Sequence, residues 1–293
     1  MRTRKAFRAG SFYPASRSAC IQLLETCLNQ VPAPEEPPRI IAGIVPHAGW
    51  VYSGPTAGKV FYNIKEKMGK ATEAPVFLIY GAVHVWGAEV PSLYPEGYWE
   101  TPLGKIEVAG ELAEKILAED IPVAADPEVH AREHSIEVQV PFIQYLFPGA
   151  KILPIMVPPD NQAVILGERI GTLLSTGNQP VVVLGSTDLT HYGPGYRFTP
   201  AGVGPETLAW SKENDRRIIQ LALEMKAENV IPEARSHHNA CGAGAIAAAV
   251  ATARTLGAQK GVLLEHITSY EVRSEGEIED FVGYAGIIFG IGN

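Results

Sequence analysis

Short runs of β-branched and other apolar residues alternate along the chain with longer segments of helical periodicity. The apolar runs are continuous, which is typical of strands covered on both faces of a sheet. They predict buried strands at Ile40–Val45, Val76–Tyr80, Lys151–Val157, Val181–Gly185, Val262–Thr268 and Gly283–Phe289. Helical patterns lie before and between them, at Ser16–Asn29, Thr56–Met68, Gly110–Glu119, Ser135–Phe147, Gln162–Ser175, Pro205–Lys226 and Gly242–Leu256. This alternation predicts an α/β fold with a mixed or mostly parallel central sheet and helices on both faces.

Two segments interrupt the alternation. Val31–Arg39 is rich in proline and acidic residues, which indicates a connector between elements rather than a linker between domains. Glu89–Leu103 combines prolines and a glycine with aromatic residues, and we expect it to be a long ordered loop near a cleft. Neither segment is long enough to divide the chain. We therefore expect residues 1–293 to form one domain.

Charge and composition narrow the class of partner. The net charge of -8 argues against nucleic acid or an anionic membrane as a partner, because both need clustered Lys and Arg. No apolar run approaches the ~20 residues that cross a bilayer, and the basic N-terminus is not followed by the apolar segment of a secretory signal. The three cysteines make a poor disulfide framework. We expect a cytoplasmic protein whose partners are small molecules or other proteins.

Three histidines follow three of the predicted strands at equivalent places. His47 comes after the first strand, His84 after the second, and His191 after Val181–Gly185, with Asp188 three residues before it. In an open α/β sheet the carboxyl ends of the strands face the crevice where ligands bind. Neutral imidazole is a common ligand for divalent transition metals. The pattern predicts a metal site built from loops at this edge of the sheet.

The candidate anionic ligands are Asp188, Cys241 and Glu137. Cys241 is followed by small residues that mark a helix N-terminus, where the helix dipole and free amide groups favour the thiolate. His134 and Glu137 lie three residues apart, a spacing that places both on one face of a helix. For His134 and Glu137 we weigh direct ligation against helix capping or support of the ligands, and favour the latter. Remaining histidines, His130, His237, His238 and His266, are expected to have surface or hydrogen-bonded roles.

The ordered motifs are similar to those of a known family. Ala-Gly-Ser-Phe-Tyr-Pro at 9–14, Pro-His-Ala-Gly-Trp-Val-Tyr-Ser-Gly at 46–54, Glu-His-Ser-Ile-Glu at 133–137, Ser-Thr-Asp-Leu-Thr-His-Tyr at 186–192 and Ala-Cys-Gly at 240–242 resemble the Memo-like protein family. The resemblance implies a fold like that of the class III extradiol ring-cleaving dioxygenases, with iron or copper at the carboxyl edge of the sheet. Carried over, the family's site positions fall on His47, His84, Asp188, His191 and Cys241. The chain departs from the family where Val85 replaces the second histidine of a Gly-Pro-x-His-His pattern.

Our working hypothesis is a metal-dependent, dioxygenase-like oxidoreductase acting on a small molecule. His47, His84 and Cys241 would bind a divalent metal, with iron(II) as the first candidate and copper or zinc as alternatives. His191 and Asp188 would serve as acid and base. The aromatic residues Trp50, Tyr52 and Tyr192 would either line the pocket or pack in the core.

Two other readings stay open at this point. Cys241, His191 and Asp188 have the composition of a nucleophile, a base and an orienting acid, so the chain could be a metal-free cysteine hydrolase or acyl transferase. It could also be a non-catalytic module that binds a peptide or protein, since members of the Memo-like family have been proposed to act through protein partners. Histidine without accompanying arginine is a weak set for binding a phosphorylated peptide, however.

Overall fold

A central mixed sheet organises the molecule. The computed structural model describes residues 2–29, 37–68, 73–274 and 276–292, and within them nine strands form this sheet. Its centre consists of four parallel strands, adjacent in the order β2 (Arg39–Val45), β9 (Val181–Ser186), β3 (Val76–Gly81) and β8 (Lys151–Met156). Their residues are buried almost throughout, as expected for strands covered on both faces.

The strands that border this centre, β12 (Phe281–Ile291) and β4 (Ser92–Leu93), are antiparallel to it. On one side β12 pairs with β2, and both β11 (Gly261–Thr268) and β10 (His191–Tyr192) pair with β12. On the other side β4 pairs with β8, and β7 (Ala124–Ala125) with β4. A second, small sheet consists of β1 (Thr3–Arg4), β5 (Tyr98–Thr101) and β6 (Gly104–Glu107).

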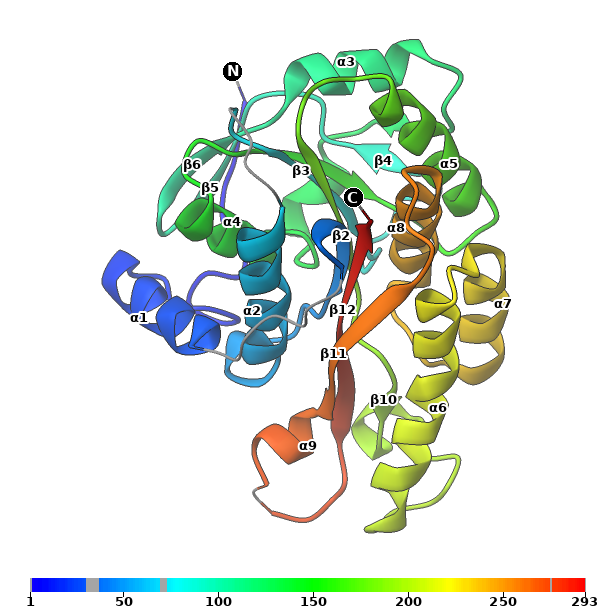
Figure 1. Ribbon diagram of the computed structural model, residues 1–293. Helices are drawn as coiled ribbons and strands as arrows, with labels where there is room; N and C mark the ends of the chain where they lie inside the picture. The colour runs from blue at the N-terminus through cyan, green and yellow to red at the C-terminus, as the bar shows by residue number, and fades with distance from the viewer. Residues whose placement is uncertain (1, 30–36, 69–72, 275, 293) are drawn as a thin grey trace.

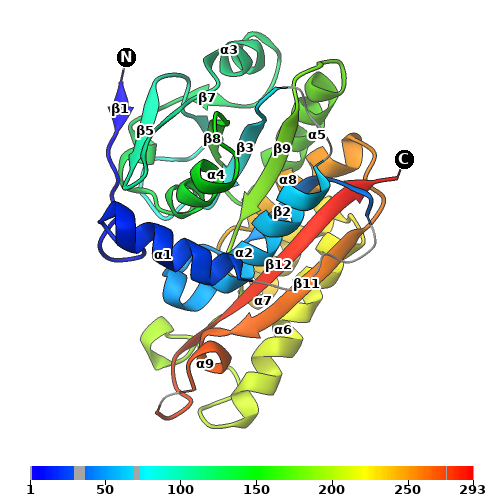
Figure 2. The same cartoon turned by 60° about the vertical axis from the view of Figure 1, so that its left-hand side comes forward.

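Helices cover both faces of the central sheet (Figures 1 and 2). On one face α2 (Trp50–Lys67) packs on β2 and β12, and α1 (Arg17–Leu28) packs on α2. On the other face α8 (Ala243–Thr255) lies against β2, β3 and β9 and is flanked by three further helices, α5 (Gln162–Ser175), α6 (Glu206–Leu223) and α7 (Ala227–His237). Residues 243–253 of α8 are all buried, because this helix is apolar on every side.

The remaining elements are short. They are α3 (Gly110–Ala118), α4 (Val140–Leu146), α9 (Ser269–Val272) and three 3-10 turns, η1 (Val129–Arg132), η2 (Glu137–Gln139) and η3 (Pro194–Tyr196). Among the described residues no helix has both the length and the apolar character that a membrane span requires.

The fold class predicted from the sequence is confirmed, since each predicted strand and each predicted helical segment has a counterpart. Several boundaries differ. The helix predicted to start at Thr56 begins at Trp50, so that Pro55 lies inside the first turns of α2. The helix predicted over Ser135–Phe147 opens as the 3-10 turn η2, and only α4 is α-helical. The helix α7, which contains Pro232, was not predicted.

The segment Glu89–Leu103, predicted as a long ordered loop near a cleft, is ordered but is not a continuous loop. This segment contains β4 and β5, whose backbone groups pair with β8 and with β1 and β6. Tyr94 and Trp99 are buried in the core there, whereas Tyr98 is partly buried and lines a surface cavity. Most of the predicted connector Val31–Arg39 lies outside the described residues.

Candidate metal centre

Three site residues follow three adjacent parallel strands. His47 lies two residues after β2, Asp188 two residues after β9, and His84 three residues after β3. Because β9 lies between β2 and β3 in the sheet, the loops that carry these residues are neighbours at its carboxyl edge. The strand order therefore explains how residues far apart in the chain meet.

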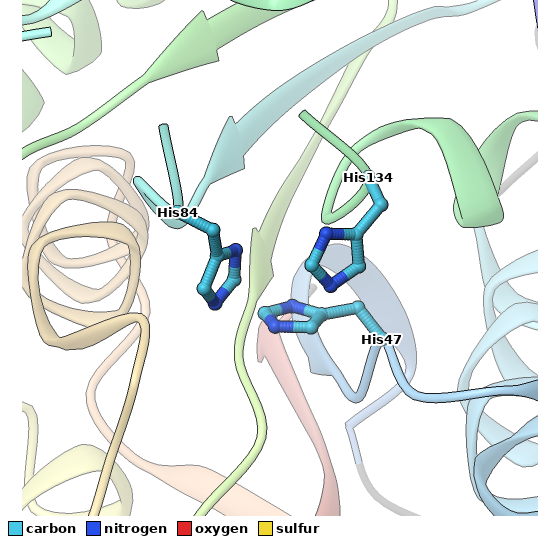
Figure 3. A group of neighbouring side chains, drawn as sticks. All are labelled: His47, His84 and His134. Atoms are coloured by element: carbon cyan, nitrogen blue, oxygen red, sulfur yellow. The ribbon is translucent and has the colours of Figure 1, made fainter. Parts of the chain in front are cut away.

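The centre of the site is a cluster of three imidazoles, His47, His84 and His134, which we call the imidazole cluster. One ring nitrogen from each lies within 4.8 Å of one from each of the others. The ring centroids are 5.1 Å apart for His47 and His84, 5.3 Å for His47 and His134, and 4.6 Å for His84 and His134. Figure 3 shows the three rings arranged around a common space.

His134 reaches the cluster from the loop that precedes η2. This loop lies so close to the end of β3 that a Cβ atom on Gly81 would be 2.5 Å from Ile136 Cγ1 and 2.8 Å from Ser135 Oγ. Ser135 Oγ also donates a hydrogen bond to the carbonyl of Ala82. Only glycine permits this approach, so Gly81 places His134 beside His84.

Glu133 supports two of the three imidazoles. Its carboxylate is buried and accepts hydrogen bonds from the backbone N–H groups of His84, His134 and Ser135, at 2.7 to 2.9 Å. His84 Nδ1 lies 3.0 Å from Glu133 Oε1, and His134 Nδ1 lies 3.5 Å from the same oxygen. Burial alone would raise the pKa of Glu133, but its hydrogen bond with His84 and the charge of His84 hold it well below the usual range. Glu133 is thus a fixed anion that orients the ring of His84.

The hydrogen-bond network assigns the tautomer of His47. Ser186 Oγ donates its single hydrogen to the carbonyl of Ser135 at 2.7 Å, so its 3.0 Å contact with His47 Nδ1 requires the imidazole N–H as donor. In neutral His47 the lone pair is therefore on Nε2. Gln139 Nε2 fixes the same region by donating to Ser186 Oγ and to the carbonyl of Pro46. An imidazole held in this way at one nitrogen presents the other to a metal.

The Cys241 thiol lies beside the imidazole cluster. Cys241 Sγ lies 3.2 Å from His47 Nε2 and 3.3 Å from the backbone N–H of Asp188. The loop of Cys241 closes against β9 because Gly242 has no side chain: a Cβ there would be 2.5 Å from the carbonyl oxygen of Ser186. Cys241 is therefore held at the edge of the cluster by the backbone around it.

The pKa values of Cys241, His84 and His134 are shifted by burial and by their contacts with one another and with neighbouring groups. Burial tends to raise the pKa of Cys241, but His47 and hydrogen bonding to His47 and His84 outweigh it and lower the pKa to about 6. Burial tends to lower the pKa of His84, but hydrogen bonds with Cys241 and Glu133 raise it to about 10. Burial, followed by the charge of His47, lowers the pKa of His134 to about 3. At neutral pH the metal-free site thus holds a thiolate, an imidazolium and a neutral imidazole.

Asp188 and His191 lie next to the cluster but do not pair directly. Asp188 Oδ1 accepts a hydrogen bond from the backbone N–H of His47 at 2.7 Å, and burial raises the pKa of this carboxyl. His191 Nδ1 lies 3.0 Å from the carbonyl of Leu189, and Nε2 has no hydrogen-bond partner among the described residues. Both residues line a cavity of about 490 Å³ beside the cluster. The imidazole next to Cys241 is that of His47, so Cys241, His191 and Asp188 do not form the relay expected of a hydrolase.

The other predicted site residues lie in three different environments. Tyr52 and His134 line the same cavity as His191. Trp50 is buried, donates from Nε1 to the carbonyl of Val138 and stacks on Tyr13, while Tyr192 is buried and stacks on Phe281. Glu137 faces the N-terminal segment.

The buried Glu137 carboxylate forms a second polar centre behind the site. It pairs with Arg4 Nη1 at 2.7 Å and accepts hydrogen bonds from Tyr13 Oη and from the backbone N–H groups of Phe7 and Arg8. Arg4 in turn donates from Nη2 to the carbonyl of Glu133. Glu137 therefore anchors the N-terminal segment to the loop that carries His134.

Helix α6 fixes the loop between Asp188 and His191. Asp215 Oδ1 accepts a hydrogen bond from the Thr190 backbone N–H at 2.9 Å, and its Oδ2 lies 3.0 Å from His266 Nε2. Asn214 Nδ2 donates to Thr190 Oγ1 and to the carbonyl of His237. Asn214 and Asp215 are both buried. One turn of α6 therefore holds the loop of His191 and, through His237, the segment that leads to Cys241.

Sequence reasoning assigned no role to Glu133, Ser186 or Gln139, although all three orient the imidazoles. Glu133 and Gln139 belong to the same motif as His134, and Ser186 ends β9 next to Asp188. The sequence offered one signal: these motifs hold several polar residues next to apolar ones. Polar groups that become buried in a native fold need partners.

Comparisons with known proteins show the family of the chain. The model of the family described as Memo-like protein matches residues 4–288. The chain belongs to the Memo-like protein family. A MEMO1 family protein of Thermococcus onnurineus is 38% identical over 289 residues, which cover 96% of this chain and 97% of that protein. MEMO1 family proteins of Caldivirga maquilingensis and Pyrobaculum arsenaticum are 36% and 34% identical, each match covering 99% of both chains.

In this Memo-like chain the residue after His84 is Val85. Its side chain is partly buried and packs against the hydrophobic core. The imidazole cluster is nevertheless complete with three rings, since His134 takes part in it. A group of three imidazoles suits iron, copper or zinc, so it fits a transition metal without selecting one.

Proposed function

We propose that this Memo-like protein is a cytoplasmic, metal-dependent oxidoreductase that uses dioxygen to oxidise a small organic molecule, in the manner of the class III extradiol dioxygenases. The observation that carries the proposal is the imidazole cluster with Cys241 at its edge and a cavity beside it. His47, His84, His134 and Cys241 are the candidate donors, and iron(II) is the first candidate metal.

Hydrogen bonds orient these side chains in the metal-free protein. Ser186 and Glu133 hold the Nδ1 atoms of His47 and His84, so each Nε2 is available to a cation. Cys241 and Glu133 supply negative charge, which offsets part of the charge of a divalent ion. When bound, iron(II) would supply redox chemistry with dioxygen and would polarise a hydroxyl group of the substrate.

His191 is the candidate general base. Its Nδ1 is occupied by the carbonyl of Leu189, and the ring borders the cavity, so Nε2 can accept a proton from a substrate hydroxyl. Asp188 also borders the cavity, and the charge of His191 offsets part of the effect of burial on the pKa of Asp188. Tyr196 packs edge-on against the His191 ring, with 5.0 Å between centroids, and limits the orientations of the base.

The proposal is tested by anaerobic loading of the purified protein with iron(II), followed by measurement of oxygen consumption with a panel of catechol-like compounds. We expect oxygen uptake that depends on both the metal and an organic substrate. The His191→Gln variant should retain the metal and lose most of the turnover. Tight iron binding without oxygen uptake across a broad panel would argue against the oxidase reaction while leaving the metal site intact.

A metal-free cysteine hydrolase or acyl transferase is the second candidate, favoured by the low pKa of the Cys241 thiol next to His47. In that case His47 would be the base. The two functions separate on metal content: a stoichiometric metal that protects Cys241 from alkylation supports the oxidoreductase, whereas a metal-free protein that hydrolyses activated esters supports the hydrolase.

A further inference from the structure

The cavity beside the imidazole cluster has features that select a class of ligand. Its volume of about 490 Å³ falls in the range of ~300–1,000 Å³ that is typical of small-molecule sites. His134, Asp188 and His191 border it on the side of the cluster. Five aromatic residues line it, Phe12, Tyr52, Tyr196, Tyr270 and Tyr284. Walls of this kind favour a flat organic ligand that stacks on rings.

Arg273 is the cation in the lining of this cavity. It follows α9, and its guanidinium lies over the ring of Tyr52, 5.7 Å from the centroid. Within the described part of the chain, no carboxylate pairs with this guanidinium, and the one hydrogen bond of Arg273 is made by its backbone N–H to Ser269. An arginine left with unused donors at the wall of a cavity can bind a carboxylate through two parallel hydrogen bonds.

A second arginine, Arg8, packs against Phe12, which lines the cavity. The Arg8 guanidinium lies between the rings of Phe7 and Phe12, 4.7 and 4.6 Å from their centroids. Phe12 lines the cavity and packs edge-on against His134 at 5.0 Å. Arg8 Nε is buried and has no hydrogen-bond partner among the residues that the structure describes. Arg8 therefore adds positive charge at the Phe12 wall that no carboxylate of the described chain neutralises.

The acidic groups of the lining limit the charge of the ligand. Asp188 and Asp280 already accept hydrogen bonds from backbone N–H groups, of His47 and Gly195 respectively, and Glu277 lies exposed in the lining. Three carboxylates near the cavity would repel a dianion such as a phosphate monoester more strongly than a single carboxylate. In addition, one guanidinium can bind one carboxylate through two parallel hydrogen bonds.

We propose that this cavity binds a small aromatic monocarboxylate, with its carboxylate on Arg273 and its ring between the tyrosines. The inference rests on the proposed function, since it assigns the substrate class of the same site. The carboxylate binds at the Tyr52 wall, and the opposite end of the ring points to the imidazole cluster and His191. Arg8 contributes long-range attraction at the Phe12 wall.

The binding test uses isothermal titration calorimetry with 4-hydroxybenzoate on the metal-free protein, so it does not depend on any turnover. The neutral analogue 4-hydroxybenzamide and the dianion phenyl phosphate are titrated in parallel. A charge-assisted pair is typically worth about a factor of 10 or more in affinity, so both should bind at least about 10-fold more weakly than 4-hydroxybenzoate. Equal affinity for the carboxylate and the amide, the absence of 4-hydroxybenzoate binding, or a preference for phenyl phosphate would each overturn the proposal.

Variants locate the site of binding. Arg273→Gln should weaken 4-hydroxybenzoate at least about 10-fold without changing the affinity for the amide, and Arg8→Gln should weaken it by a smaller factor. Arg39→Gln is the matched control, because Arg39 is an exposed arginine at the opposite end of β2 from His47. Unchanged carboxylate affinity in Arg273→Gln refutes the assignment. Carboxylate binding without oxygen uptake in the loaded protein would leave this inference standing and count against the proposed reaction alone.

Discussion

Substitution of Glu133 tests whether this carboxylate orients the candidate metal ligands or only stabilises the fold. The change Glu133→Gln keeps the shape of the side chain but removes its charge. It replaces one carboxylate oxygen by an NH2 group, which accepts no hydrogen bond. Either the contacts of Oε1 with His84 Nδ1 and the N–H groups of His134 and Ser135 are lost, or the contact of Oε2 with the His84 N–H is lost. The ring of His84 then loses the anion that fixes its orientation, and the site loses one negative charge.

The expected loss can be estimated from the contacts. Loss of an outer carboxylate that orients a ligating histidine typically weakens metal binding about 10- to 100-fold, or roughly 1.4–2.7 kcal/mol. Glu133 is 1% exposed and contacts both His84 and His134, so solvent does not replace what it provides. We therefore expect the effect to lie in the upper half of that range.

The assay is competition of the metal-free protein with a chromophoric chelator for zinc, which avoids redox chemistry during the titration. Glu137→Gln is the matched control, because Glu137 is an equally buried carboxylate in the same motif that pairs with Arg4 and faces away from the cluster. Its removal should lower the melting temperature and leave the affinity of the folded protein for zinc close to that of the unmodified chain. The reasoning is refuted if Glu133→Gln binds zinc as tightly as Glu137→Gln does.

Three further predictions follow from the same contacts. Because the pKa of Cys241 is lowered to about 6, its alkylation in metal-free protein should reach half its maximal rate near pH 6, and a rate that still rises between pH 8 and 9 would contradict this. Burial lowers the pKa of His130 from 6.5 to about 4, so below pH 6.5 the unfolded chain gains a proton that the fold excludes. The free energy of unfolding should fall by up to roughly 3 kcal/mol between pH 6.5 and 4, and denaturant titrations of His130→Phe should show a smaller fall. Asn214→Ala leaves Thr190 and the His237 carbonyl without a buried partner and should cost about 1–3 kcal/mol in thermal or chemical unfolding; an unchanged midpoint would contradict the role of α6.

The sequence sufficed to predict the sheet and the loops that meet at its edge. It did not suffice to predict which side chains contact one another there. Continuous apolar runs identified β2, β3 and β9, and the residues after each strand sufficed to expect His47, His84 and the loop of Asp188 at one edge. That inference needs only the rule that parallel strands end at the same edge. The order of the strands in the sheet, in which β9 lies between β2 and β3, is not needed for it. The third histidine expected at this edge, His191, lies in β10, and His134 completes the cluster instead.

The role of His134 could not be predicted in the same way. Its segment was expected to be a helix, and helical spacing would place His134 and Glu137 on one face. In the structure η2 starts with Glu137, and the two side chains diverge, one to the imidazole cluster and the other to Arg4. The contact that decides this is the approach of Ile136 to Gly81, which is tertiary and leaves no periodic signal in either segment.

The most direct test of the central claim is the metal content of the protein purified without chelators, measured by elemental analysis beside the His47→Ala variant. We expect close to one transition-metal ion per chain in the unmodified protein and a loss of most of it in the variant, with circular dichroism showing both proteins folded. A metal-free chain that stays empty after incubation with iron(II), copper and zinc, or a variant that retains the metal, would contradict the assignment of the imidazole cluster as a metal centre.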